Sequence, residues 1–587
     1  MKRTVSRRDF LAMSARGIGA AVVSYGLLGC SSSEDEATVP ASFMHGVASG
    51  DPLHDAVILW TRATPESAGA VLVSWEVALD SKFNEVVNAG SMRTNADKDY
   101  TVKVDARGLE AGTTYYYRFK TGDNTSSVGT TKTLPEGAVS QVKFAVMSCA
   151  NFPAGYFHVY DMAANESDLD AVLHLGDYLY EYARGEYASE DAAELGREVL
   201  PEGELFALND YRTRYAQYRG DASLQKLHAA VPFITVWDDH EVANDTWKNG
   251  AENHNDGEGD FDQRKMDALQ AYFEWLPIRP YREDDNEEIF RSFNYGDLVD
   301  LHMLDTRIIG RDEQLTFDTY IDPTTGAFDG EKFEQDLGST DRTMLGQLQL
   351  IWLQGQLLSA NGQWQVLGQQ VLMGKMFLPA AIATQQLTVA QYAELGALAQ
   401  LAARAQAGDP TLTPEELAYL QANQHKLTPE VLALLQLPSI PYNLDAWDGY
   451  AYEREVILGT AKSRNQNLVV LAGDTHNAWA NDLRDINGDV VGVEFATASV
   501  SSPGLELYLG LTPEQVVPTE AAITGLVSDL KYTNLADRGY MTVTFTPEKV
   551  SSEWRYVSSI KSAEYTEQTE RRMSASSAAG NPGVELG

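Results

Sequence analysis

The stretch Phe233-Ile-Thr-Val-Trp-Asp-Asp-His-Glu241 indicates an α/β fold, because an apolar run is followed directly by a cluster of charged residues. A short apolar run of this kind is typical of a buried strand in an α/β sheet. The charged cluster would follow the carboxyl end of that strand, where α/β proteins bind their ligands. The stretch therefore predicts both a buried strand and a candidate site at its end.

Three more places in the chain show the same change of character. The apolar runs are residues 142–147, 171–175 and 467–472, and the clusters after them contain Cys149, Asp177 to Glu181, and Asp474 to His476. Helical stretches at 264–276 and 343–358 lie between the runs, which predicts a layered α/β domain. Cys, Tyr, Asp and His side chains gathered at one sheet edge would form a metal site with sulfur, oxygen and nitrogen donors. We therefore predict a metal site.

These clusters resemble the signature of the PhoD-type alkaline phosphatases and phosphodiesterases. The matching motifs are Gly176-Asp-Tyr-Leu-Tyr-Glu181, Trp237-Asp-Asp-His-Glu241, Gly473-Asp-Thr-His476, His45-Gly-Val-Ala-Ser-Gly-Asp-Pro52 and Asp305-Thr-Arg307. The resemblance covers nearly all of residues 41–560. It implies a four-layer α/β metallophosphatase fold of the calcineurin-like type, with two packed sheets flanked by helices and an all-β domain before them. It also implies a cluster of iron(III) and calcium and the hydrolysis of phosphate esters.

The resemblance further implies which residues bind the metals. The iron ligands would be Cys149, Asp177, Tyr180, Asp239 and His476. Asp177 would bridge to calcium, and Asp474 would complete the calcium side. Thiolate and tyrosinate suit a ferric ion, and carboxylates suit calcium. Asp238 remains an alternative to Asp239, and Asp262 is a weaker candidate ligand for a second calcium.

Three basic side chains are candidate catalytic residues. Arg264 and Arg307 would neutralise charge on the transferring phosphoryl group, with a structural salt bridge as the alternative for each. His240 would orient a phosphate oxygen or protonate the leaving group, or else form a hydrogen bond to a ligand carboxylate. Family members often carry two asparagines shortly after the Trp-Asp-Asp-His-Glu motif, whereas this chain has Asn244-Asp245.

The segments around these motifs suggest the domain organisation. Residues 41–135 contain β-branched and aromatic runs separated by glycine turns, which predicts a fibronectin-like β-sandwich. Residues 141–560 would form the catalytic domain. Within it, residues 380–435 carry two cap-like starts, at Thr413 and Thr428, and are predicted to be a helical insertion. Residues 561–587 are polar and are predicted to be a loose tail.

The N-terminus has the character of an export signal. Ser6-Arg-Arg-Asp-Phe-Leu11 is a twin-arginine pattern, and the apolar run that follows it, 18–28, is too short to span a bilayer. Leu27-Leu-Gly-Cys30 resembles a lipoprotein cleavage box, with residues 31–40 as a linker. If Cys30 carries a lipid, Cys149 has no cysteine partner and is either a buried inert thiol or a metal ligand.

Composition narrows the function further. The 587 residues include 84 acidic and 45 basic side chains, a net charge of −39 that argues against general nucleic-acid binding. We therefore predict an exported, lipid-anchored, monomeric phosphate-ester hydrolase in the periplasm or at the cell surface, acting on monoesters or diesters. The alternatives are a phosphodiesterase of phospholipase D-like activity on the same fold, a surface binding module with an inactive catalytic domain, and a structural calcium-binding protein.

Overall fold

The computed structural model describes residues 38–280, 286–324 and 328–587. The export signal, the lipidation site at Cys30 and most of the linker predicted from the sequence lie outside these ranges. Among the described residues, no helix combines the length and apolar character needed to cross a membrane.

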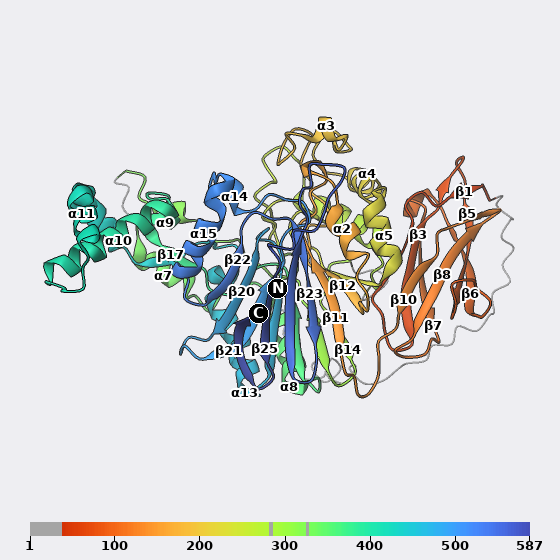
Figure 1. The fold of residues 1–587 in the computed structure, drawn as a ribbon. Helices are drawn as coiled ribbons and strands as arrows, with labels where there is room; N and C mark the ends of the chain where they lie inside the picture. The colour runs from red at the N-terminus through yellow and green to blue at the C-terminus, as the bar shows by residue number, and fades with distance from the viewer. Residues whose placement is uncertain (1–37, 281–285, 325–327) are drawn as a thin grey trace.

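Two large sheets form the centre of the molecule (Figure 1). The ten-stranded sheet has the order β26 (Asn581–Leu586), β25 (Met573–Ala578), β24 (Lys549–Tyr556), β23 (Gly539–Phe545), β11 (Val142–Met147), β12 (Ala171–His174), β13 (Phe233–Thr235), β2 (Val47–Gly50), β3 (Ala56–Arg62), β7 (Thr101–Arg107). The seven-stranded sheet has the order β14 (Arg291–Tyr295), β15 (Val299–Met303), β16 (Trp364–Gly368), β19 (Asn467–Ala472), β21 (Val490–Ala496), β20 (Ala478–Arg484), β22 (Leu530–Asn534). A single apolar core, which includes Phe144, Val469 and Trp554, contains residues of both sheets.

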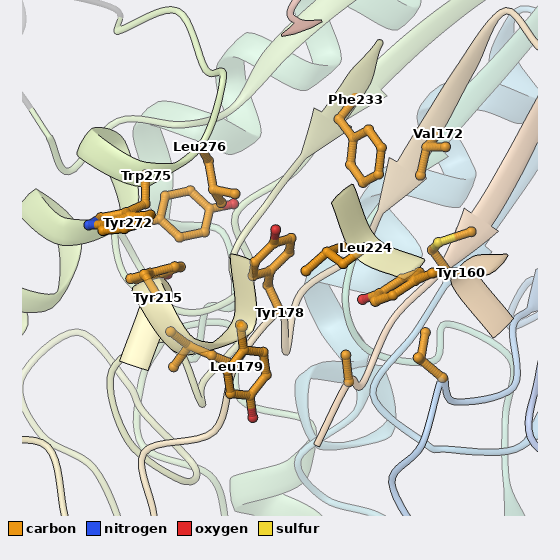
Figure 2. Close-up of a cluster of buried hydrophobic side chains, with 14 of the residues drawn as sticks. Tyr160, Val172, Tyr178, Leu179, Tyr215, Leu224, Phe233, Tyr272, Trp275 and Leu276 are labelled. Atoms are coloured by element: carbon orange, nitrogen blue, oxygen red, sulfur yellow. The ribbon is translucent and has the colours of Figure 1, made fainter. Parts of the chain in front are cut away.

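Helices cover the outer face of each sheet. Those on the ten-stranded sheet are α2 (His158–Ala163), α4 (Leu208–Arg219), α5 (Ala222–Ala230) and α6 (Phe261–Trp275). Those on the seven-stranded sheet are α8 (Gly346–Ser359), α13 (Ala451–Ser463) and α15 (Pro513–Leu526). Figure 2 shows the apolar core between the ten-stranded sheet and its helices. Tyr215, Trp275 and Tyr178 belong to this core, together with Phe233 of β13. The mixed α/β architecture predicted from alternating strands and helices is confirmed.

The N-terminal β region is joined to the central sheet more closely than the sequence suggested. This region has a sheet of its own, which contains β10 (Gly129–Lys132), β8 (Thr114–Thr121), β5 (Val71–Ala78) and β6 (Val86–Thr94). That sheet shares an apolar core with β2, β3 and β7 of the ten-stranded sheet. However, β2 also pairs in parallel with β13, at Gly50 and Phe233. A Cβ at Gly50 would lie 2.5 Å from the carbonyl oxygens of Phe233 and Pro277, so this approach requires glycine. One face of the β region is thus an extension of the ten-stranded sheet.

The helical segment expected at 380–435 lies between the paired strands β17 (Phe377–Pro379) and β18 (Ser439–Pro441). It consists of α9 (Ala380–Ala383), α10 (Val389–Gln406), α11 (Pro414–Asn423) and α12 (Pro429–Leu435). The side chains of Thr413 and Thr428 cap α11 and α12, as their sequence motifs predicted. In Figure 1, α10 and α11 lie at the opposite end of the molecule from the N-terminal β region.

The prediction of a loose C-terminal tail is wrong. β25 pairs with β24 in an antiparallel arrangement, and β26 pairs with β25, so the chain end extends the ten-stranded sheet. The polar composition suggested a loose tail because the buried positions of β25 hold small side chains, Ala575 and Ser577, and not large apolar ones. Such a strand is held by its backbone pairing and needs few large apolar residues.

His174 lies inside the core, on β12, and is fully buried. Its Nε2 pairs with the hydroxyl of Tyr160 at 2.9 Å. Burial lowers the pKa of His174 to about 3. Burial, helped by the positive charges of Arg62 and Arg219, also lowers the pKa of His45 to about 3. Both side chains are therefore neutral in the folded protein at neutral pH.

Acid should destabilise the fold through these histidines. In the unfolded chain they titrate near pH 6.5, so their contribution is complete above that pH and is lost as the pH falls towards 3. Each contributes a slope of at most about 1.4 kcal/mol per pH unit in this window. We expect His174→Gln to flatten the slope of urea-unfolding free energy against pH between 6.5 and 4, while the exposed-site control His425→Gln keeps it. An equally steep slope in His174→Gln would contradict this assignment.

Candidate metal centre

The predicted donor residues converge where four strands end. β11, β12 and β13 are parallel neighbours. An isolated parallel bridge joins Ser148, after β11, to Ser499, after β21, and β19 pairs in parallel with β21 in the other sheet. The turns after these strands place non-glycine residues at positive φ, which is uncommon and concentrates at functional sites. These residues are Cys149 (62°), Asp177 (53°), Asp474 (59°) and His476 (61°).

Three overlapping groups of donor atoms result, each with its ligand atoms within 4.8 Å of one another. They are Cys149 with Asp177 and His476, Asp177 with Asp239 and His240, and Asp238 with Asp239 and Asp474. Asp177 is shared by two groups and Asp239 by two, so the groups form one continuous cluster. Tyr180 adjoins it, since its hydroxyl donates to Asp177 Oδ2 at 2.9 Å and lies 3.2 Å from His476 Nε2.

The cluster has the chemistry of a cation site. Asp177 Oδ1 and Asp238 Oδ2 are buried without a hydrogen-bond partner among the described residues, an arrangement that is costly unless a cation or donor meets them. Burial, reinforced by the charge of Asp177, raises the pKa of the Cys149 thiol well above its ordinary value. Burial also raises the pKa of Asp474 to about 7, against the opposing charge of Arg307. A bound cation would reverse these shifts and ionise the donors.

His476 is oriented as a ligand. Its Nδ1 lies 2.7 Å from the carbonyl oxygen of Pro503, which can only accept, so Nδ1 carries the proton. Nε2 is therefore the nitrogen with a lone pair, and it is the atom nearest Asp177 Oδ2, at 4.0 Å. A second hydrogen bond that fixes the tautomer in this way is typical of metal-binding histidines.

The geometry distinguishes the two adjacent aspartates. Asp238 Oδ1 accepts from Arg307 Nε at 2.5 Å, whereas Asp239 accepts the backbone N–H of Asp245 at 2.6 Å and lines the cavity described below. Burial alone would raise the pKa of Asp239, but Arg307 and His240 lower it to about 2. Asp239 is thus the ionised carboxylate that faces the cavity, whereas Asp238 is paired with Arg307 and does not line the cavity.

Arg307 lies behind the cluster and is fully buried. Besides Asp238, it donates to Asp445 at 2.8 Å and to Asp474 at 3.2 Å. It is not among the residues that line the cavity. Its contacts are those of a buried ion-pair network, which was the structural alternative considered for it. No motif pointed to Asp445, because its contact with Arg307 joins segments that lie far apart in the chain.

Two candidates lie away from the cluster. Asp262 is 77% exposed on the first turn of α6 and pairs with Lys265 at 3.3 Å. A carboxylate at that position stabilises a helix N-terminus, which explains its presence. Arg264 donates to Glu204 at 2.7 Å and to the carbonyl of Asn253 at 2.8 Å. The structure therefore brings neither Asp262 nor Arg264 to the cavity.

His240 is held by Glu181, the last residue of the Gly176–Glu181 motif, for which no role was predicted. Its Nδ1 lies 2.7 Å from Glu181 Oε2, and its ring packs 4.1 Å from the ring of Tyr180. Glu181 is buried and also accepts from the backbone of Asn244 and the side chain of Asn253. Burial alone would lower the pKa of His240, but the charges of Asp239 and Glu181 raise it well above its ordinary value. These two carboxylates therefore favour the protonated, hydrogen-bond-donating form of His240.

Glu241 joins two of the ligand-bearing turns. Its carboxylate accepts the backbone N–H groups of Asp177 at 3.1 Å, Tyr178 at 2.5 Å and Asp238 at 2.7 Å. Gly176 permits this approach, because its φ is 103° and a Cβ there would lie 2.4 Å from the Asp238 side chain. Glu241 thus sets the distance between the β12 and β13 turns.

The donor cluster opens into a cavity of about 500 Å³. Four carboxylates line it: Asp177, Asp239, Asp245 and Asp474. No lysine or arginine is among its described lining residues. Burial and the nearby charge of Asp445 raise the pKa of Asp245 to about 7. Cations bound among these carboxylates would offset their charge and favour the entry of an anionic ligand.

Replacing Glu241 with glutamine should loosen the centre. The amide has one acceptor oxygen for three N–H groups and would turn its own NH₂ towards one of them. Each orphaned donor costs about 1–3 kcal/mol. We expect Glu241→Gln to lower both the melting temperature and the metal content measured by mass spectrometry, whereas Glu331→Gln, on the exposed surface of α7 (Gly330–Leu337), changes neither. Wild-type metal content in Glu241→Gln would contradict the role given to this carboxylate.

Comparison with known proteins identifies a matching family. Residues 144–554 match the family model described as PhoD-like phosphatase, and residues 29–135 match its N-terminal domain. The chain is 34% identical over 529 residues to alkaline phosphatase D of Bacillus subtilis (strain 168), covering 87% of this chain and 77% of the relative. A solved structure titled "Structure of PhoD" is 31% identical, with a TM-score of 0.72 and coverage of 94% of this chain and 93% of that one. The chain is therefore a homologue of alkaline phosphatase D and belongs to the PhoD-like phosphatase family.

Proposed function

We propose that this protein is an exported, metal-dependent phosphoric ester hydrolase of the phosphatase and phosphodiesterase type. The observation that carries the proposal is the continuous donor cluster at the floor of a cavity lined by four carboxylates. A phosphate ester would be repelled from these carboxylates unless cations were bound among them. The same cations would then attract its phosphoryl oxygens.

The donor chemistry supports a division between two kinds of metal. Iron(III) would be held by Cys149, Asp177, Tyr180, Asp239 and His476. Calcium would be held by Asp177, as the bridge, and Asp474. When bound, these ions supply Lewis acidity, which polarises the phosphoryl group and lowers the pKa of water so that it becomes a better nucleophile towards phosphorus.

The chain's own residues would position and protonate the substrate. His240, held by Glu181, can donate its free ring N–H to a phosphoryl oxygen or to the departing alcohol oxygen. Arg307 holds the carboxylates of Asp238 and Asp474 in place and lessens their mutual repulsion. We therefore assign His240 a catalytic role and Arg307 a positioning role.

Metal analysis combined with ester hydrolysis tests this function. Protein exported by its native host should contain iron and calcium and should hydrolyse a nitrophenyl phosphate monoester, the matching diester, or both, with activity lost on chelation. Serine lacks the thiolate that binds iron, so Cys149→Ser should lose iron and lower kcat/KM by more than about 100-fold. A metal-free protein with no turnover on either ester would instead support a binding module, and unchanged rate and iron content in Cys149→Ser would contradict the ligand assignment.

We also propose export by the twin-arginine route and lipid attachment at Cys30, supported by the motifs at residues 6–11 and 27–30. Replacing both Arg7 and Arg8 with lysine should leave the precursor in the cytoplasm. Cys30→Ser should still be exported but should lose labelled palmitate and leave the membrane fraction. A Cys30→Ser protein that stays with the membrane as wild-type does would contradict the anchor.

A further inference from the structure

The cavity has a second wall whose chemistry the reaction does not explain. Opposite in character to the donor cluster, this apolar wall consists of Leu372, Met376, Tyr442, Trp479, Leu505 and Tyr508. No member carries a charge. All six come from segments that follow β16, whereas the turns that carry Asp177 and Asp239 follow β12 and β13. One cavity thus joins a charged region to an apolar one.

The apolar wall is fixed to the metal centre by hydrogen bonds. The indole N–H of Trp479 donates to Thr475 Oγ1 at 3.0 Å, and the backbone N–H of Leu505 donates to Asn477 Oδ1 at 2.9 Å. Thr475 and Asn477 flank His476, so the turn that carries a predicted ligand also positions the wall. A ligand held at the donor cluster would therefore meet the wall at a defined place.

The helical segment is attached at this wall. Met376 directly precedes β17 and Tyr442 directly follows β18, so the two strands that carry α9 to α12 begin and end at wall residues. The N–H of Tyr442 donates to the carbonyl of Met376 at 2.8 Å, and the N–H of Met376 donates to the buried Asp448 carboxylate at 2.8 Å. The wall is thus built on paired backbone and does not depend on a free loop.

The wall runs from the interior to the rim of the cavity. Leu372, Met376 and Leu505 are buried, whereas Tyr508 on α14 (Leu505–Tyr508) is 60% exposed. The hydroxyl of Tyr508 is 3.0 Å from that of Tyr187, which itself lines the cavity on the side of the donor cluster. An apolar group could therefore lie along the wall and extend towards solvent beside Tyr508.

We infer that the apolar wall is the binding subsite for an organic substituent of the phosphate ester, and that it selects apolar or aromatic substituents over small polar ones. The inference rests on the proposed function, because it places the phosphoryl group at the donor cluster. A cavity of about 500 Å³ is in the range that holds a drug-sized ligand, well beyond phosphate alone. Burial of a phenyl group against such a wall is favoured by the area it removes from water.

Competitive inhibition by phosphonates tests the subsite, because a phosphonate carries one substituent on a stable P–C bond. Phenylphosphonate should inhibit ester hydrolysis at least about tenfold more tightly than methylphosphonate in the metal-loaded wild-type protein. Met376→Gln, which keeps side-chain volume but adds an amide, and Tyr508→Ser, at the exposed rim, should each lower this ratio towards one. Leu507→Ser, on α14 but outside the cavity lining and 55% exposed, should keep the wild-type ratio.

The outcomes separate the subsite from the proposed function. Hydrolysis with no preference for phenylphosphonate, or a preference retained in both wall variants, would overturn the subsite and leave the hydrolase intact. A protein that hydrolyses no ester when loaded with metal would overturn the proposed function, and the subsite with it. A ratio lowered equally by Leu507→Ser would assign the effect to α14 as a whole and would also overturn the subsite.

Discussion

Negative charge gathered at the ends of three buried strands is the constraint on which the rest of this structure depends. Asp177, Asp238, Asp239 and Asp474 lie close together in a buried cluster, where like charges repel and desolvation disfavours ionisation. Arg307 offsets part of this charge through hydrogen bonds to Asp238 and Asp474. Burial, reinforced by the remaining negative charge, raises the pKa of Asp474, and cations bound there would offset that charge for an incoming anion.

The fold supplies the rigidity that such a cluster needs. Parallel strands deliver the ligands to one edge, Glu241 joins two of the turns, and Glu181 fixes His240. The two sheets meet at the same edge and share a core, so their strand ends cannot separate without exposing apolar surface. Stability and metal binding would therefore be two consequences of one arrangement, and a positioning residue such as Glu241 would affect both.

The sequence indicated the donor cluster because each group of candidate donors follows an apolar run within a few residues. That relation is local, so the polar clusters that contain Cys149, Asp177, Asp239 and His476 could be found without a structure, while the family resemblance implied which members bind metal. Asp262 and Arg264 were misplaced because their helix faces another part of the molecule, which only tertiary packing decides. The second sheet contact of β2, the paired chain end and the apolar wall escaped notice for the same reason, since each joins segments far apart in the chain.

Anomalous diffraction from crystals of the exported protein, recorded above and below the iron absorption edge, would show whether the donor cluster binds iron. We expect an iron peak within bonding distance of Cys149 Sγ, Asp177 and His476 Nε2, with a second, lighter ion on the Asp474 side of Asp177. Strand-end carboxylates that instead hold only water, with Cys149 unligated and no anomalous peak in protein that hydrolyses phosphate esters, would contradict this expectation.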